Sequence, residues 1–127
     1  MEILTKKLGR ILFALPFAIF GINHLLMADA MVGIVPAFIP FGIFWVYLIG
    51  LCQIAASIAI MVNYLARAAS FGLAIMLATF VLTIHLPGIL GDNMQMAMVS
   101  FLKDFALMGA ALMTAGITRN FPAKPQA

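Results

Sequence analysis

The chain has 127 residues, of which 65% are hydrophobic and 9% charged, a balance that excludes an ordinary water-soluble domain. Its formal net charge of +3 comes from seven Lys or Arg against four Asp or Glu, too scattered to form a nucleic-acid-binding surface. Cys52 is the only cysteine, so the chain alone has neither an internal disulfide nor a two-cysteine thiol relay. We therefore expect an all-α integral membrane protein that contacts the lipid bilayer and no nucleic acid.

Four apolar stretches are each long enough to cross a bilayer, since a spanning helix needs about 20 apolar residues. The expected spans cover residues 9–28, 43–62, 67–84 or slightly beyond, and 97–117. The run from His85 through Pro87 to Gly88 is expected to end the third span, because Pro disfavours helix at the residue before it. The predicted fold is a four-transmembrane-helix bundle.

The segment between the first two spans is apolar but interrupted by Gly33, Pro36 and Pro40, and it is too short to span. We expect an interfacial loop between helices 1 and 2, folded onto the outer mouth of the bundle. Residues 1–118 then form a single four-helix transmembrane domain, and residues 119–127 form a polar cytoplasmic tail.

The charges predict how the spans are oriented. Six of the seven basic residues fall on one side of the four spans: Lys6, Lys7, Arg10, Arg67, Arg119 and Lys124. The two loops on the other side contain Asp29 and Asp92 and no Lys or Arg. Because Lys and Arg accumulate in cytoplasmic loops, we expect both termini in the cytoplasm.

Small residues recur at helical spacing in three spans and allow helix backbones to approach closely in lipid. They are Ala55, Ala56 and Ala59 in the second span, Ala68, Ala69 and Gly72 in the third, and Gly109, Ala110 and Gly116 in the fourth. We expect helix packing, not a ligand, to account for them.

Four polar side chains inside the spans are candidate ligand-binding residues, because polar groups in lipid are costly and usually face the interior of a bundle. Counting about 1.5 Å per residue, His24 and His85 both lie about 25 Å from the cytoplasmic ends of their spans. Gln53 lies about 15 Å deep, near the midplane, and Lys103 about 10 Å deep from the outer side. We predict that His24, Gln53, His85 and Lys103 line one polar pocket in the outer half of the bundle.

Each of these residues also has a plainer explanation. Lys103 could simply snorkel to the outer headgroups. Asp104, about 100° round the helix from Lys103, is expected to pair with a neighbour or face the loop, and not to act as a catalytic base. Two histidines at one depth would suit bis-histidine haem, but interfacial hydrogen bonding is the commoner role for such residues, so we predict no metal site.

A series of short motifs runs through the four spans. They are Gly9-Arg10, Gly21-Ile-Asn-His24, Pro36-Ala-Phe-Ile-Pro40, Tyr47 with Gly50 and Gln53, Arg67-Ala68-Ala69, His85-Leu-Pro87, and Phe101-Leu-Lys103-Asp104 with Gly109. Their order resembles the DoxX family of small bacterial membrane proteins, related to the DoxD subunit of thiosulfate:quinone oxidoreductase. The resemblance implies a four-helix bundle in the bacterial inner membrane, beside redox or oxidative-stress partners.

This chain departs from the family pattern at one position. Where members commonly have Glu two or three residues after the glycine of the second span, it has Gln53. Because an amide cannot titrate, the resemblance does not carry a proton-relay role over to this residue.

Three function classes follow from these observations. The leading hypothesis is a subunit or accessory protein of a quinone-linked or oxidative-stress redox system, whose pocket holds a quinone-like head group through donors from lysine, imidazole and amide. The second is a non-enzymatic lipid-binding or assembly protein that docks a larger membrane partner. A small-solute transporter is disfavoured, because four spans without internal repeats would have to dimerise. The residues do not decide whether the chain is catalytic or whether it forms a homodimer.

Overall fold

The structure is a computed structural model that describes residues 1–92 and 94–121, and in these ranges four helices are long and apolar enough to cross a membrane. The first span joins the π-helical segment η1 (Ile3–Leu8) to α1 (Gly9–Leu26), and the second is α3 (Gly42–Val62). The third joins α4 (Ala66–Phe80), the π-helical turn η3 (Val81–His85) and α5 (Leu86–Ile89), and the fourth is α6 (Met94–Ile117). The predicted all-α membrane bundle is confirmed.

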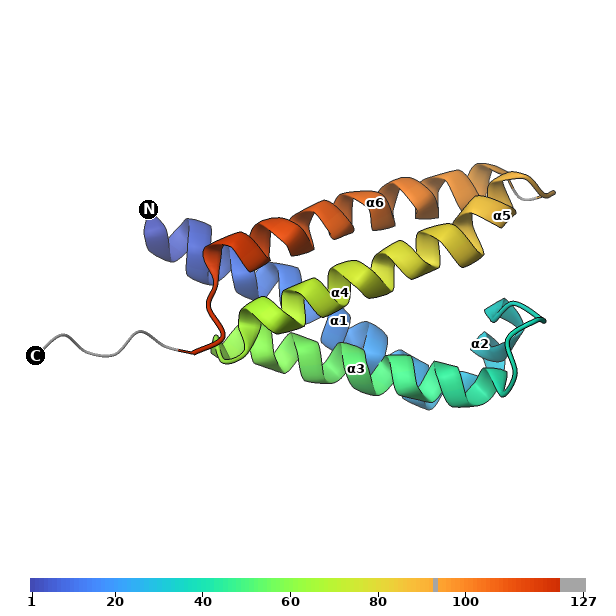
Figure 1. Ribbon diagram of the computed structural model, residues 1–127, viewed down its shortest axis with the longest axis horizontal. Helices are drawn as coiled ribbons and strands as arrows, with labels where there is room; N and C mark the ends of the chain where they lie inside the picture. The colour runs from blue at the N-terminus through green and yellow to red at the C-terminus, as the bar shows by residue number, and fades with distance from the viewer. Residues whose placement is uncertain (93, 122–127) are drawn as a thin grey trace, which may run out of the picture.

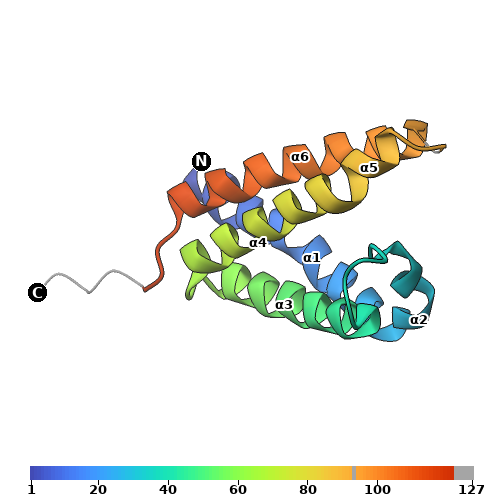
Figure 2. The same cartoon turned by 45° about the vertical axis from the view of Figure 1, so that its right-hand side comes forward.

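The four spans are arranged as two pairs. Helix α1 packs along α3, α4 packs along α6, and the two pairs meet mainly where α3 contacts α4. Figures 1 and 2 show the pairs close together at the end that carries the N-terminus, and diverging towards the end that carries α2 and α5. The bundle is therefore more open at the end away from the N-terminus.

Helices α1 and α3 cross at two glycines. A Cβ atom added to Gly21 would lie 2.6 Å from the carbonyl oxygen of Gly50, and one added to Gly50 would lie 2.7 Å from the Cβ of His24. Neither position has room for a side chain without moving backbone or the base of a neighbouring residue. The crossing thus fixes the depth and rotation of α1 against α3.

A buried core holds the two helix pairs together nearer the end of the bundle that carries the N-terminus. It comprises Ala14, Phe17, Ile60, Leu73, Ala74, Leu77 and Ala111, with Ala56 and Ala69 packed against it. Ser57 is fully buried and donates its hydroxyl hydrogen to the carbonyl oxygen of Ala14 at 2.7 Å. Ala56 and Ala69 therefore do serve packing, whereas a Cβ added at Gly72, Gly109 or Gly116 would meet nothing within 4 Å in the part of the chain that the structure describes.

The end of the fourth span is tied to the start of the third. Arg67 donates through Nε to the carbonyl oxygens of Ala115 and Thr118 at 3.1 and 2.9 Å, where a helix C-terminus leaves carbonyls without partners. Asn120 accepts from the backbone N–H of Leu65 and, through Oδ1, from that of Ala68. The first residues of the expected tail are thus docked on the bundle, and residues 122–127 lie outside the described residues.

The third span is longer than the sequence predicts. It continues past Pro87 to Ile89, because Pro87 falls in the first turn of α5, where a helix does not need its N–H. The widened π-helical turn before α5 contains His85. The first and fourth spans also begin earlier than expected, at Ile3 and Met94.

The connection between α1 and α3 is partly helical. It contains α2 (Ala28–Met31) and the 3-10 turn η2 (Val32–Ile34), then an irregular stretch that ends at Phe41, whose φ of 59° is left-handed. Trp45, in the first turn of α3, donates its indole N–H to the carbonyl oxygen of Pro40 at 2.9 Å. This bond anchors the end of the connection to α3.

We expect Gly21→Ala to destabilise the bundle by about 1–3 kcal/mol, because its methyl group would overlap the backbone of α3. The measurement is the thermal unfolding midpoint in detergent, followed by circular dichroism. The matched control is Gly109→Ala, which adds the same methyl group to open space on α6. Equal midpoints for the two variants would show that the α1–α3 crossing does not limit stability.

Candidate functional site

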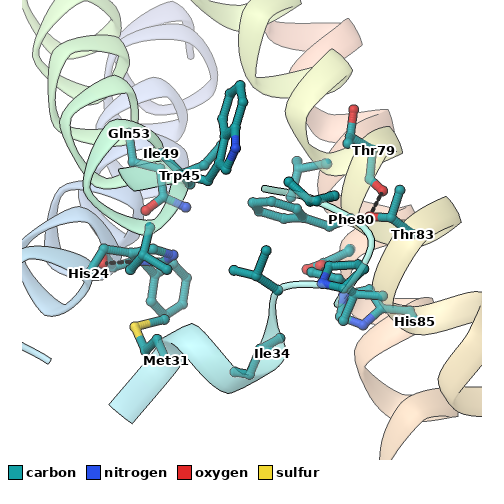
Figure 3. A pocket seen from close by; sticks show the side chains of 18 of the residues that line it. His24, Met31, Ile34, Trp45, Ile49, Gln53, Thr79, Phe80, Thr83 and His85 are labelled. Atoms are coloured by element: carbon teal, nitrogen blue, oxygen red, sulfur yellow. Dashed lines mark hydrogen bonds and ion pairs between the residues drawn. The ribbon is translucent and has the colours of Figure 1, made fainter. Parts of the chain in front are cut away.

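A cavity of about 520 Å³ lies between the two helix pairs at the divergent end of the bundle. Its walls come from both pairs, and the connection between α1 and α3 contributes Met31, Ile34, Val35, Pro36 and Ile39. Figure 3 shows His24 and Gln53 on one side of the cavity and Thr79, Phe80, Thr83 and His85 on the other. The expected loop over the mouth is therefore part of the cavity wall.

All four of the predicted site residues line this cavity: His24 from α1, Gln53 from α3, His85 from η3 and Lys103 from α6. Most of the remaining lining is apolar or aromatic, including Phe20, Trp45, Ile49 and Phe80. An apolar cavity with a few converging polar groups is the usual form of a small-molecule site.

Gln53 is 3% exposed, and its Oε1 atom is buried with no hydrogen-bond partner among the described residues. Such an unsatisfied buried amide costs about 1–3 kcal/mol. Natural cores avoid this cost unless a water or a ligand completes the bond. The oxygen of Gln53 is thus available to accept a hydrogen bond from a ligand or a water in the cavity.

His24 is held by its own helix. Its Nδ1–H donates to the carbonyl oxygen of Phe20 at 2.7 Å, since a carbonyl can only accept. In a neutral ring this leaves Nε2 as an acceptor. The close approach of Gly50 to the Cβ of His24 fixes where the ring enters the cavity wall.

His85 and Asp104 form a hydrogen-bonded pair between the third and fourth spans. The Nε2 atom of His85 lies 2.6 Å from Oδ2 of Asp104, and the two side chains are only 16% and 10% exposed. The π-helical turn that ends in His85 shifts this residue out of the regular α-helical register, a distortion often found at functional sites. This pair is the only imidazole–carboxylate pair among the described residues.

Asp104 was not among the predicted site residues. The Oδ1 atom of Asp104 lies 3.9 Å from Nζ of Lys103, so Asp104 has the charged neighbour that was expected. The Asp104 side chain does not face the loop. It is 7% exposed, lines the cavity and bonds to a residue 19 positions earlier in the chain. The available signal was that Asp104 is the only carboxylate inside a predicted span.

Lys103 is the most open of the site residues, with a side chain 56% exposed. Its Nζ atom lies 5.8 Å from the ring centre of Phe20, across the cavity mouth on α1. This distance is typical of a cation–π contact. Lys103 therefore both reaches the surface, as snorkelling predicts, and lines the cavity.

The described residues contain no group of three or more His, Cys, Asp or Glu side chains that could hold a metal ion. The site consists instead of hydrogen-bonding groups on an apolar wall. Such a surface can bind a neutral molecule with a ring or chain and a few oxygen atoms.

A family model for DoxX matches residues 6–86 of this chain. The chain belongs to the DoxX family. The match runs from the start of the first span to the residue after His85, so it includes His24, Gln53 and the connection that lines the cavity. Lys103 and Asp104 lie beyond the matched residues. No curated protein and no solved structure matches the chain.

We expect the His85–Asp104 bond to contribute to stability as a coupled unit. Replacing either residue with Ala leaves a buried polar partner unsatisfied and should cost about 1–3 kcal/mol, while the double variant should cost less than the sum. Unfolding midpoints of the two single variants and the double variant measure the coupling. Asp29→Ala, at an exposed carboxylate, is the control; additive effects would show that the pair is not coupled.

Proposed function

We propose that this DoxX protein is a membrane subunit or accessory protein of a quinone-linked redox system, and that its cavity binds the quinone head group. The observation that carries the proposal is the convergence of polar groups from α1, α3, η3 and α6 on one apolar cavity, where Oε1 of Gln53 has no hydrogen-bond partner in the part of the chain that the structure describes. Aromatic side chains such as Phe20, Trp45 and Phe80 provide flat surfaces for a ring.

The polar groups suit the chemistry of a quinone couple. Quinone reduction consumes electrons and protons together, and the His85–Asp104 pair can hold a proton close to a ligand oxygen. The side chains of the cavity do not carry electrons, so in this proposal the electrons pass to or from the redox centre of a protein partner. The chain thereby acts as the part of a larger system that holds the lipid-soluble substrate.

A second candidate is a non-enzymatic lipid-binding or assembly protein. It is favoured by the apolar character of most of the cavity lining and by the outer face of α6, where Leu102, Phe105 and Met113 are exposed. Within a membrane such a face contacts lipid or a partner helix.

The retained small molecules distinguish these two candidates. We expect organic extracts of the protein, purified in mild detergent and examined by mass spectrometry, to contain a quinone in the wild type and little in His85→Ala. Cys52→Ala is the matched control, because Cys52 is exposed and lines a groove between α3 and α4, away from this cavity. A phospholipid or a protein partner without any quinone would instead favour the assembly role.

We also propose that the protein lies in the bacterial cytoplasmic membrane with both termini in the cytoplasm. Lys6, Lys7 and Arg10 precede the core of the first span, and Arg67 lies at the same end of the bundle, bonded to the C-terminal turn of α6. Asp29 and Asp92 lie in the connections at the opposite end. This distribution supports the positive-inside orientation.

An alkaline phosphatase fused after Ala127 should therefore be inactive, because the enzyme is active only outside the cytoplasm, while a fusion in the loop at Asp92 should be active. Activities normalised to the amount of fusion protein give the result. An active fusion at Ala127 together with an inactive one at Asp92 would reverse the orientation.

A further inference from the structure

Two donor groups of the cavity, the ammonium of Lys103 and the NH₂ of Gln53, make no hydrogen bond among the described residues, whereas the other donors are occupied by the protein itself. The hydroxyls of Thr79 and Thr83 donate to the carbonyl oxygens of Ile75 and Thr79, at 2.9 and 2.7 Å. The indole N–H of Trp45 donates to the Pro40 carbonyl oxygen. Each of these three residues lines the cavity, yet none has a hydrogen left to offer a ligand.

Both histidines show the same pattern. The Nδ1–H of His24 is taken by the Phe20 carbonyl oxygen, and the Nε2–H of His85 is taken by Oδ2 of Asp104. Since a neutral imidazole has one N–H, the second nitrogen of each ring is an acceptor. The imidazoles that would be expected to donate to a quinone are therefore already used.

The acceptor groups that are left over outnumber the two free donor groups of Lys103 and Gln53. Oδ1 of Asp104 has Lys103 only at 3.9 Å, which is beyond hydrogen-bond distance, and Oε1 of Gln53 has no partner among the described residues. The hydroxyl oxygens of Thr79 and Thr83 also keep lone pairs after donating. The amide of Gln53 can turn to present either its oxygen or its nitrogen, but the other acceptors remain acceptors whichever way it turns.

From this imbalance we propose that the cavity selects a ligand that donates hydrogen bonds through hydroxyl groups, and therefore binds the hydroquinone more tightly than the quinone. The identification of the ligand as a quinone couple rests on the proposed function, whereas the preference for hydroxyl donors rests on the cavity alone. A quinone has two carbonyl oxygens and no donor, so it leaves the acceptors of Asp104 and Gln53 unsatisfied. The hydroquinone supplies two O–H groups to them.

Tighter binding of the reduced form raises the reduction potential of the bound couple. A tenfold preference corresponds to about 30 mV for a two-electron couple. The site would then hold the reduced substrate, the hydroquinone. The hydroquinone delivers electrons only to a partner whose reduction potential is higher than that of the bound couple.

Trp45 provides the probe for a direct test, because it is the only tryptophan in the chain and lines the cavity. The protein in lipid nanodiscs is titrated anaerobically with a short-chain hydroquinone and separately with the matching quinone, and Trp45 fluorescence reports binding. A second pair, a para-alkyl phenol and its methyl ether, removes the donor without any redox chemistry. We expect the hydroquinone and the phenol each to bind about tenfold more tightly than its partner.

Variants test which side chains produce the preference for a hydroxyl donor. Asp104→Asn replaces a carboxylate oxygen with a donating NH₂ group and should reduce the preference several-fold, and Thr83→Val, which keeps the side-chain shape, should reduce it less. The control Cys52→Ala lies on α3 next to Gln53 but outside this cavity, and should keep the wild-type ratio. The ligand pairs give an answer in the wild type even if a variant fails to fold.

The outcomes separate the inference from the proposed function. If quinone binds as tightly as hydroquinone, and ether as tightly as phenol, the donor preference is wrong while the quinone role stands. If neither member of the quinone pair binds but the phenol binds better than its ether, or a hydroxylated lipid binds, the donor preference stands and the quinone role is wrong. Absence of binding by every probe overturns both.

Discussion

The close crossing of α1 and α3 at Gly21 and Gly50 is the constraint on which the rest of the site depends. With no side chain at either position, the two backbones pack in direct contact, and no space for a ligand remains between them. Because α1 and α3 run antiparallel (Figure 1), His24, three residues after Gly21, and Gln53, three residues after Gly50, lie one turn from the contact in opposite directions, and both line the cavity. The cavity of about 520 Å³ lies instead between this pair and the α4–α6 pair.

The opposite wall depends on a local distortion. A regular helix from Ala66 to Ile89 would keep His85 in the register of the residues before it, but the π-helical turn adds a residue and changes the direction in which His85 points. Its imidazole meets Asp104 on α6, and this bond links the third and fourth spans where the pairs diverge. The two walls are thus built differently, one by backbone contact and the other by a buried polar bond.

Much of the fold and of the cavity lining could be predicted from the sequence. Physical reasons explain why the other features could not. Hydropathy and length were enough to find four spans, and counting residues along each span placed His24, Gln53, His85 and Lys103 in one half of the bundle, where all four line the cavity. The role of Asp104 could not be found this way, because helical periodicity gives its angle from Lys103 but not which helix faces it. The predicted end of the third span was too early, because the sequence does not show that Pro87 falls in the first turn of a further helix, where proline is tolerated. Gly72, Gly109 and Gly116 looked like packing positions, but a Cβ added at any of them would meet nothing within 4 Å among the described residues.

The charges of the cavity narrow its occupant further. Its one carboxylate is bonded to an imidazole and has a lysine beside it, while Gln53 on the facing pair is a neutral amide. An anion would therefore meet a carboxylate at the inner wall, and a cation would have to compete with Lys103 at the mouth. A neutral ligand faces neither penalty, and it can also partition into the bilayer that surrounds the open end of the bundle. With a neutral amide at Gln53 and its one carboxylate already bonded to His85, the cavity suits an uncharged, membrane-soluble molecule.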